Sequence, residues 1–163
     1  MSLPDLAAVL WRQRDLLERL VYRLECEHLL LAAGRTRFLA LATAEVEELL
    51  GELRVLELQR STAADRVAAE VGLDAGTSLE RLAGAAEPPW TGVLLEHREA
   101  LLALVGELAA LAETNRSLMA AGMRAVESAI GGAGTGTSSV GYDARGRSDL
   151  ISGAGPLVVD RSL

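Results

Sequence analysis

The chain of 163 residues has no lysine, one cysteine and five aromatic residues. Cys26 cannot form an internal disulfide by itself, and its place in an apolar-periodic stretch indicates a small buried side chain rather than a reactive thiol. The sixteen basic residues are all arginine and face 23 acidic residues, which gives a net charge of −7. Because an acidic surface repels phosphate backbones, nucleic acid is not an expected partner.

The sequence also lacks a long hydrophobic run. Its longest apolar run begins at Leu29, "LLLAAG", and falls far short of the roughly 20 residues that span a bilayer. The start "MSLPDLAAVLWRQR" has neither a basic beginning nor a small-residue cleavage site, so we expect no signal peptide. These features predict a cytoplasmic protein without membrane insertion.

Residues with the spacing of a catalytic, metal or cofactor site are missing as well. Residues 131–147, "GGAGTGTSSVGYDARGR", are glycine-rich, but a phosphate loop needs a lysine after its glycines. Cys26 and His28 are two residues apart on a predicted helix and therefore face different directions. We expect no metal, no cofactor and no enzyme activity. His97, in "LLEHREALL", leaves a phosphotransfer helical bundle as one alternative.

Leucine and alanine supply most of an apolar fraction of 50%, a profile typical of long packed helices. One apolar stripe begins after Pro4, and a second follows Gly34, with Thr36 as its expected N-cap. The second stripe is shifted by one residue against the first, which favours two helices or one sharply bent helix over a straight rod. The stripes comprise Leu6, Leu10, Leu17, Leu20, Leu24 and Leu31, and then Leu39, Ala42, Val46, Leu49, Leu53, Leu56, Ala63 and Val67.

A connector separates these stripes from a third long helix. Gly72 and Gly76 are expected to end the second helix, and "TSLE", residues 77–80, has capping-box spacing for a short helix to about Ala85. After Pro88 and Pro89 a heptad pattern runs from residue 90 to 130, where glycines are expected to stop the helix. Its seam contains Leu94, His97, Leu101, Leu104, Leu108, Leu111, Asn115 and Leu118.

These patterns predict an all-α fold. We expect an elongated antiparallel bundle with coiled-coil character, built from three long helices and one short helix in residues 1–130. Residues 131–163 form a predicted flexible Gly/Ser-rich tail. "WTG", residues 90–92, matches the turn motif of secreted helical-hairpin substrates, so a secreted substrate or scaffold protein is a second alternative. A tryptophan that opens a helix and packs on the end of the bundle is the preferred interpretation.

Several segments in order resemble FlgN-type flagellar export chaperones over roughly residues 15–147. They include "LAAGRTRFLALATAEVEELLGEL", "LELQRSTAADRVAAEVGL", "SLERLAGAAEPPW" and "HREALLALVGELAALAETNRSLM", followed by a glycine-rich tail bearing "YDARGR". The resemblance implies a non-enzymatic cytoplasmic chaperone. Its clients would be the hook–filament junction (hook-associated) proteins, delivered to the type III export gate.

The end of the third helix is the predicted client-binding region. At about 100° per residue, four apolar residues fall on one face, and the helix is long enough to outrun its neighbours. Methionines suit a surface that accommodates a partner. An alternative is that these residues continue the bundle core, and Asn115 is also interpreted as a polar core residue that fixes register. The predicted client-binding residues are Asn115, Leu118, Met119, Gly122, Met123, Val126 and Ile130.

Overall fold

Four α-helices and one 3-10 turn make up residues 2–133, the part of the chain that a computed structural model describes. Their order is α1 (Ser2–Ala32), the 3-10 turn η1 (Thr36–Phe38), α2 (Leu39–Glu70), α3 (Leu79–Ala85) and α4 (Trp90–Ala133). The described part contains no strand, so the predicted all-α fold of three long helices and one short helix is confirmed. A flexible tail was predicted for residues 131–163, and residues 134–163 lie outside this part of the chain.

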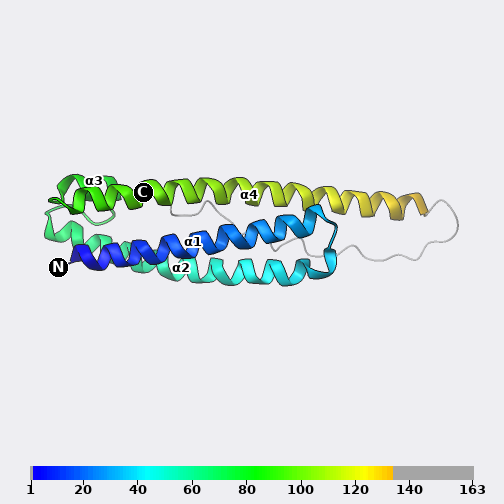
Figure 1. Cartoon of the computed structure of the whole chain (residues 1–163), viewed down its shortest axis with the longest axis horizontal. Helices are drawn as coiled ribbons and strands as arrows, with labels where there is room; N and C mark the ends of the chain where they lie inside the picture. The colour runs from blue at the N-terminus through cyan, green and yellow to red at the C-terminus, as the bar shows by residue number, and fades with distance from the viewer. Residues whose placement is uncertain (1, 134–163) are drawn as a thin grey trace.

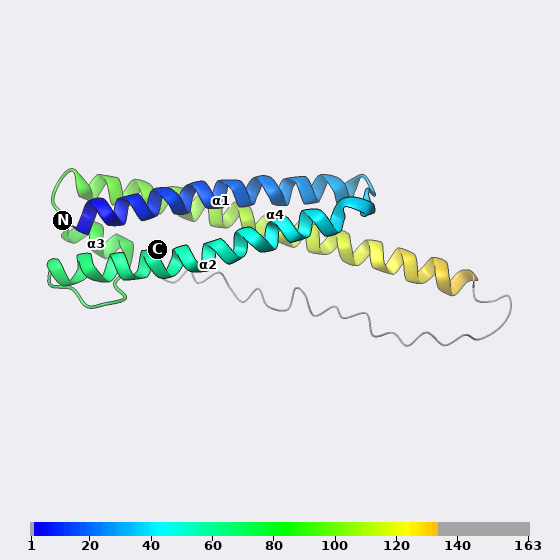
Figure 2. The ribbon, with the colours of Figure 1, turned by 90° about the horizontal axis from the view of Figure 1, so that it is seen from below.

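The long helices alternate in direction, with α1 as the central element (Figure 1). α1 and α2 form an antiparallel hairpin, and α4 then runs back along α1 in the same direction as α1. α3 packs on the beginning of α4 and also contacts α2 (Figure 2). The molecule therefore has one end built from the N-terminus, α3 and the start of α4, and an opposite end where the α1–α2 hairpin turns.

Two glycines with positive φ end the first two long helices. Gly34 has φ 64°, its N–H donates to Leu31 O at 3.1 Å, and the Arg35 N–H donates to Leu30 O at 2.9 Å. These are the two hydrogen bonds of a Schellman motif, and the left-handed conformation favours glycine. Gly72, with φ 73°, ends α2 in the same way. The chain thus has two separate helices on either side of Gly34, one of the two arrangements that the register shift favoured over a straight rod.

The predicted starts of two helices were wrong by a few residues. Thr36 does not cap α2, because it opens the 3-10 turn, and α2 begins at Leu39 without a side-chain cap. The N-cap of α3 is Ser78, whose Oγ accepts from the Arg81 N–H at 3.4 Å. The expected capping box starting at Thr77 is therefore displaced by one residue, and the Thr77 hydroxyl donates to Asp74 O instead.

α4 begins at Trp90, as predicted, but passes its expected end. It continues beyond Ile130 to Ala133, so the first two glycines after Ile130 do not stop the helix. Trp90 is half-buried and packs against the core, which agrees with a tryptophan that opens a helix at the end of the bundle. Because the "WTG" segment lies inside the first turn of α4, it does not form a turn between two helices.

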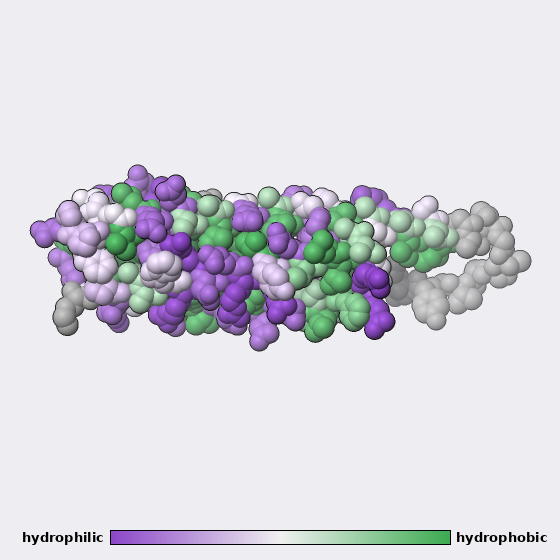
Figure 3. Space-filling view, in the orientation of Figure 1, coloured by the Kyte–Doolittle hydropathy of each residue, from purple (hydrophilic) through white to green (hydrophobic). Residues whose placement is uncertain are grey.

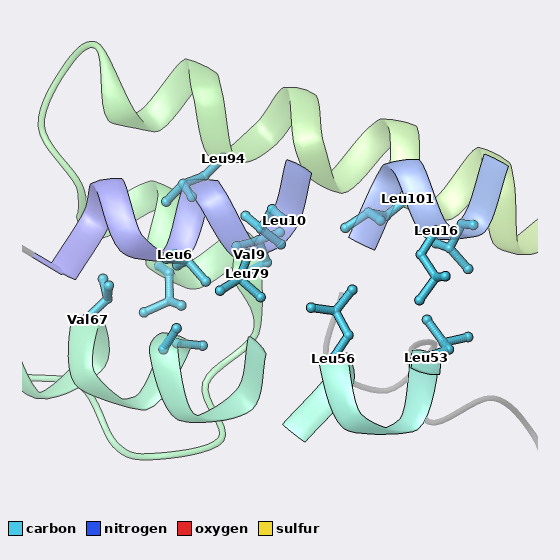
Figure 4. Close-up of a cluster of buried hydrophobic side chains, with 14 of the residues drawn as sticks. Leu6, Val9, Leu10, Leu16, Leu53, Leu56, Val67, Leu79, Leu94 and Leu101 are labelled. Atoms are coloured by element: carbon cyan, nitrogen blue, oxygen red, sulfur yellow. The ribbon is translucent and has the colours of Figure 1, made fainter. Parts of the chain in front are cut away.

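The core lies on two faces of α1, one packed against α2 and the other against α4 (Figure 4). Most of the predicted seam leucines are buried, and Leu6, Leu10, Leu17, Leu94 and Leu101 have no exposed surface. Three polar side chains in α1 and α2 are buried that the leucine pattern did not predict: Gln13, Glu27 and Arg60. Gln13 Nε2 donates to Glu57 at 2.8 Å, and Arg60 Nε donates to the same carboxylate at 3.0 Å, so this polar group is shared across the α1–α2 interface.

Candidate functional site

α4 projects beyond the end of the hairpin. It has 44 residues, whereas α1 has 31 and α2 has 32. Asn115 forms hydrogen bonds to residues 24–28 of α1, which sets the relative position of the two helices, and α1 ends only four residues after His28, at Ala32. Every residue of α4 from Ala121 to Gly131 is exposed. We call residues 121–131 the overhang, and Figures 1 and 2 show it extending past the hairpin.

The overhang has an apolar face with no covering element in the described part of the chain. Met123, Val126 and Ile130 are 56%, 59% and 68% exposed, and Met119 at the base is half-buried. We call these four residues the α4 stripe. At about 100° per residue they lie on the same side of α4 as Leu94, Leu101 and Leu108, which are buried against the bundle. The stripe therefore continues the buried face of α4 beyond the point where α1 ends.

This exposure decides between two interpretations of the stripe. The alternative that these residues simply continue the bundle core is wrong for Met123, Val126 and Ile130, because more than half of each side chain is exposed. The predicted length difference is the physical reason. The helix that would cover this face stops at Ala32.

The two remaining surface positions among the predicted binding residues flank the stripe. Leu118 is half-buried where α4 leaves the bundle, and Gly122 is exposed with open space around the position of a Cβ. Ala125 and Ala129, also exposed, lie on the same flank as Gly122. Small side chains on one flank allow another helix to approach the α4 backbone closely.

Asn115 does not belong to the exposed surface. It is 1% exposed, and its Nδ2 donates to Leu24 O at 3.0 Å and to Glu27 Oε2 at 3.1 Å. Its Oδ1 lies 3.1 Å from Nδ1 of His28. A side chain with these contacts cannot meet a client in this conformation, which corrects its inclusion among the client-binding residues. The interpretation as a polar core residue that fixes the alignment of α4 on α1 agrees with its geometry.

The cluster around Asn115 includes a buried carboxylate that the sequence reasoning missed. Glu27 is 4% exposed, and its Oε1 accepts from the Thr43 hydroxyl at 2.8 Å. Glu27, Thr43 and Asn115 thereby connect α1, α2 and α4 directly below the overhang. The signal was present in the sequence, since Glu27 lies three residues after Leu24 and four before Leu31 on the first apolar stripe.

The residues considered for chemistry do not come together. Cys26 and His28 are half-buried, and the described residues contain no group of three potential metal ligands. His97 is 2% exposed and packs edge-on against Trp11, with ring centroids 5.0 Å apart. Burial, aided by the positive charge of Arg14, lowers the pKa of His97. A phosphotransfer histidine must be reached by a phosphoryl donor, and this side chain is enclosed.

None of the helices in residues 2–133 is long and apolar enough to span a bilayer.

Comparison with known proteins identifies a family. The family model described as "FlgN protein" matches residues 1–149, which includes all of the described helices. No curated protein and no solved structure matches the chain.

Proposed function

The chain belongs to the FlgN family of flagellar export chaperones, and we propose that it binds hook–filament junction proteins through the end of α4. In this proposal the protein holds its clients in the cytoplasm and delivers them to the type III export gate. The observation that carries the proposal is the α4 stripe, an apolar helix face that is uncovered beyond the hairpin.

The stripe has the properties of a helix-binding surface. Amphipathic helices bind by placing apolar residues spaced three and four apart against an apolar groove or face. Met119, Met123, Val126 and Ile130 have this spacing, and the unbranched methionines can adapt to different partners. Covering the exposed part of Met123, Val126 and Ile130 contributes roughly 1–2 kcal/mol for each side chain. This energy favours binding that is specific and still reversible.

A chaperone that releases its client needs such limited affinity. The ordering of the client and the loss of free motion of both partners offset part of the burial energy. Because the overhang is separate from the core cluster of Leu94 and Leu101, a client can bind and leave without opening the bundle. Delivery to the export gate and location in the cytoplasm rest on membership in the family.

The proposal is tested by introducing charge into the stripe. We expect Val126→Asp with Ile130→Asp to abolish binding of purified junction proteins, measured by isothermal titration calorimetry. The melting temperature should change little, because both side chains are mostly exposed in the free protein.

The matched control places the same two charges on the opposite face of the overhang. Ala121 and Ser128 are exposed and lie roughly 140° and 160° around α4 from Val126, at about 100° per residue. Ala121→Asp with Ser128→Asp should bind the client like the parent. Retained binding by the stripe variant, or loss of its fold, would contradict the proposal.

A further inference from the structure

The end of α1 and the uncovered face of α4 meet in a corner. α1 ends at Ala32, and the chain then turns through residues 33–38, which we call the hairpin tip. All six residues of the tip are exposed, including the aromatic ring of Phe38, which is 42% exposed. Figure 3 shows apolar surface over the end of the hairpin and along the adjoining part of α4. A helix seated on the α4 stripe in the line of α1 must therefore have one end against the tip.

The tip is positively charged on a molecule that is otherwise acidic. Between His28 and Ala44 the charged residues are Arg35 and Arg37, and this interval contains no acidic residue. Neither arginine forms an ion pair within the described residues, whereas Arg19 and Arg23 of α1 pair with glutamates of α2. The guanidinium of Arg37 lies over the Phe38 ring, 4.4 Å from its centroid. Two exposed arginines beside an apolar face are complementary to an acidic segment.

The position of the tip also favours a helix end. The α4 stripe and overhang extend from Met119 to Gly131, a length of roughly 18 Å at 1.5 Å per residue. A helix of about 12 residues covers this length. Its first or last turn then lies within reach of Arg35 and Arg37, which follow directly after the last turn of α1.

We propose that the client helix takes the place of a continued α1, and that Arg35 and Arg37 select a helix whose end at the tip is acidic. This inference rests on the proposed function, since it assigns the partner of the α4 stripe to the client. Residues of the hairpin turn are then specificity-determining residues, although they lie more than 75 positions away from the stripe in the sequence. The apolar face provides most of the affinity, and the tip distinguishes between clients.

The first test reverses the charge of the tip. Arg35→Glu with Arg37→Glu should weaken binding of the junction proteins about tenfold at low salt, because like charges then face each other across the interface. The matched control, Arg54→Glu with Arg66→Glu, makes the same change at two exposed positions of α2 away from the tip. It should stay within about threefold of the parent. The difference between the variants should shrink at roughly 0.5 M salt, where the Debye length is only a few ångströms.

The outcomes separate this inference from the proposed function. If the tip variant and the control bind equally well while the Val126→Asp, Ile130→Asp variant does not bind, the role of the tip is refuted and the function stands. If the parent protein binds no junction protein, both proposals fail.

A second test locates the client directly. A photo-crosslinking phenylalanine analogue is placed at Phe38 in one sample and at Val126 in another, each in the full chain with saturating client. Both positions should crosslink to one client segment of about 12 residues. Crosslinks from Val126 alone would show that the tip is not part of the site. Crosslinks from Val126 to a second copy of the chain, or to residues 134–163, would assign the stripe to another occupant and overturn the inference.

Discussion

Replacing Asn115 by leucine should destabilise the fold by about 3 kcal/mol. The hydrogen bond to Leu24 O contributes about 1 kcal/mol, and the bond to the Glu27 carboxylate contributes roughly 1.5–3 kcal/mol. His28 is half-buried and can exchange its bond for water, so it adds little. Leucine has the same number and branching of side-chain heavy atoms as asparagine and is larger, so the substitution leaves no cavity. The main loss is the donor to Glu27, which is 4% exposed and would keep only the Thr43 hydroxyl as a donor.

A second substitution tests this reasoning. When both partners of a buried polar pair are replaced by apolar groups of similar shape, the change in stability is often close to zero. The Glu27→Met, Asn115→Leu double variant should therefore be more stable than Asn115→Leu alone. The coupling energy between the two positions should be about 2 kcal/mol.

The measurement is urea unfolding at neutral pH, followed by circular dichroism and extrapolated linearly to water. Thr114→Ala serves as the control, because the Thr114 side chain is exposed and its hydroxyl bonds only within α4, to Ala110 O. It should change the free energy of unfolding by less than about 0.5 kcal/mol. The reasoning is refuted if Asn115→Leu unfolds like the parent, or if the effects of the two substitutions simply add.

Two further predictions concern the core and the pH dependence of stability. Leu49→Ala and Leu101→Ala should each cost about 2–5 kcal/mol in urea unfolding, because Leu49 is 5% and Leu101 0% exposed. Leu58→Ala, at a position 70% exposed, should have little effect, and an equal loss at Leu58 would show that the assigned core face is wrong. Since burial lowers the pKa of His97, the unfolded chain takes up the proton first as the pH falls, so stability should decline below about pH 6.5. The decline should be shallower in His97→Leu, and an identical pH profile would contradict this assignment.

The sequence alone determined the helices, their number and most of the core. Leucines spaced by threes, fours and sevens recur over three long segments, and this period fits only helices that bury one face. Gly34 and Gly72 were recognisable as helix ends because they permit the left-handed conformation that a Schellman motif requires. The ordered segments also carried the resemblance to the FlgN family, which the family match over residues 1–149 confirms.

Some helix boundaries could not be predicted from the sequence, because neighbouring residues have similar chemistry. Thr77 and Ser78 are both good N-cap residues, and in the structure Ser78 caps α3 while the Thr77 hydroxyl donates to Asp74 O. Gly131 and Gly132 have a low helix propensity, yet α4 continues to Ala133, because low-propensity positions weaken a long helix without always ending it.

Only the tertiary structure decided which apolar and polar residues of α4 are covered. Asn115 and Ile130 both follow the apolar period of α4, yet one is 1% and the other 68% exposed. The difference arises from the alignment of α4 on α1, which the hydrogen bonds between Asn115 and Leu24, Glu27 and His28 hold in place. Local spacing specifies a face, but coverage of that face depends on where a neighbouring helix ends. In this protein α1 ends at Ala32, only four residues after His28, and the face of α4 beyond that level is uncovered within the described residues.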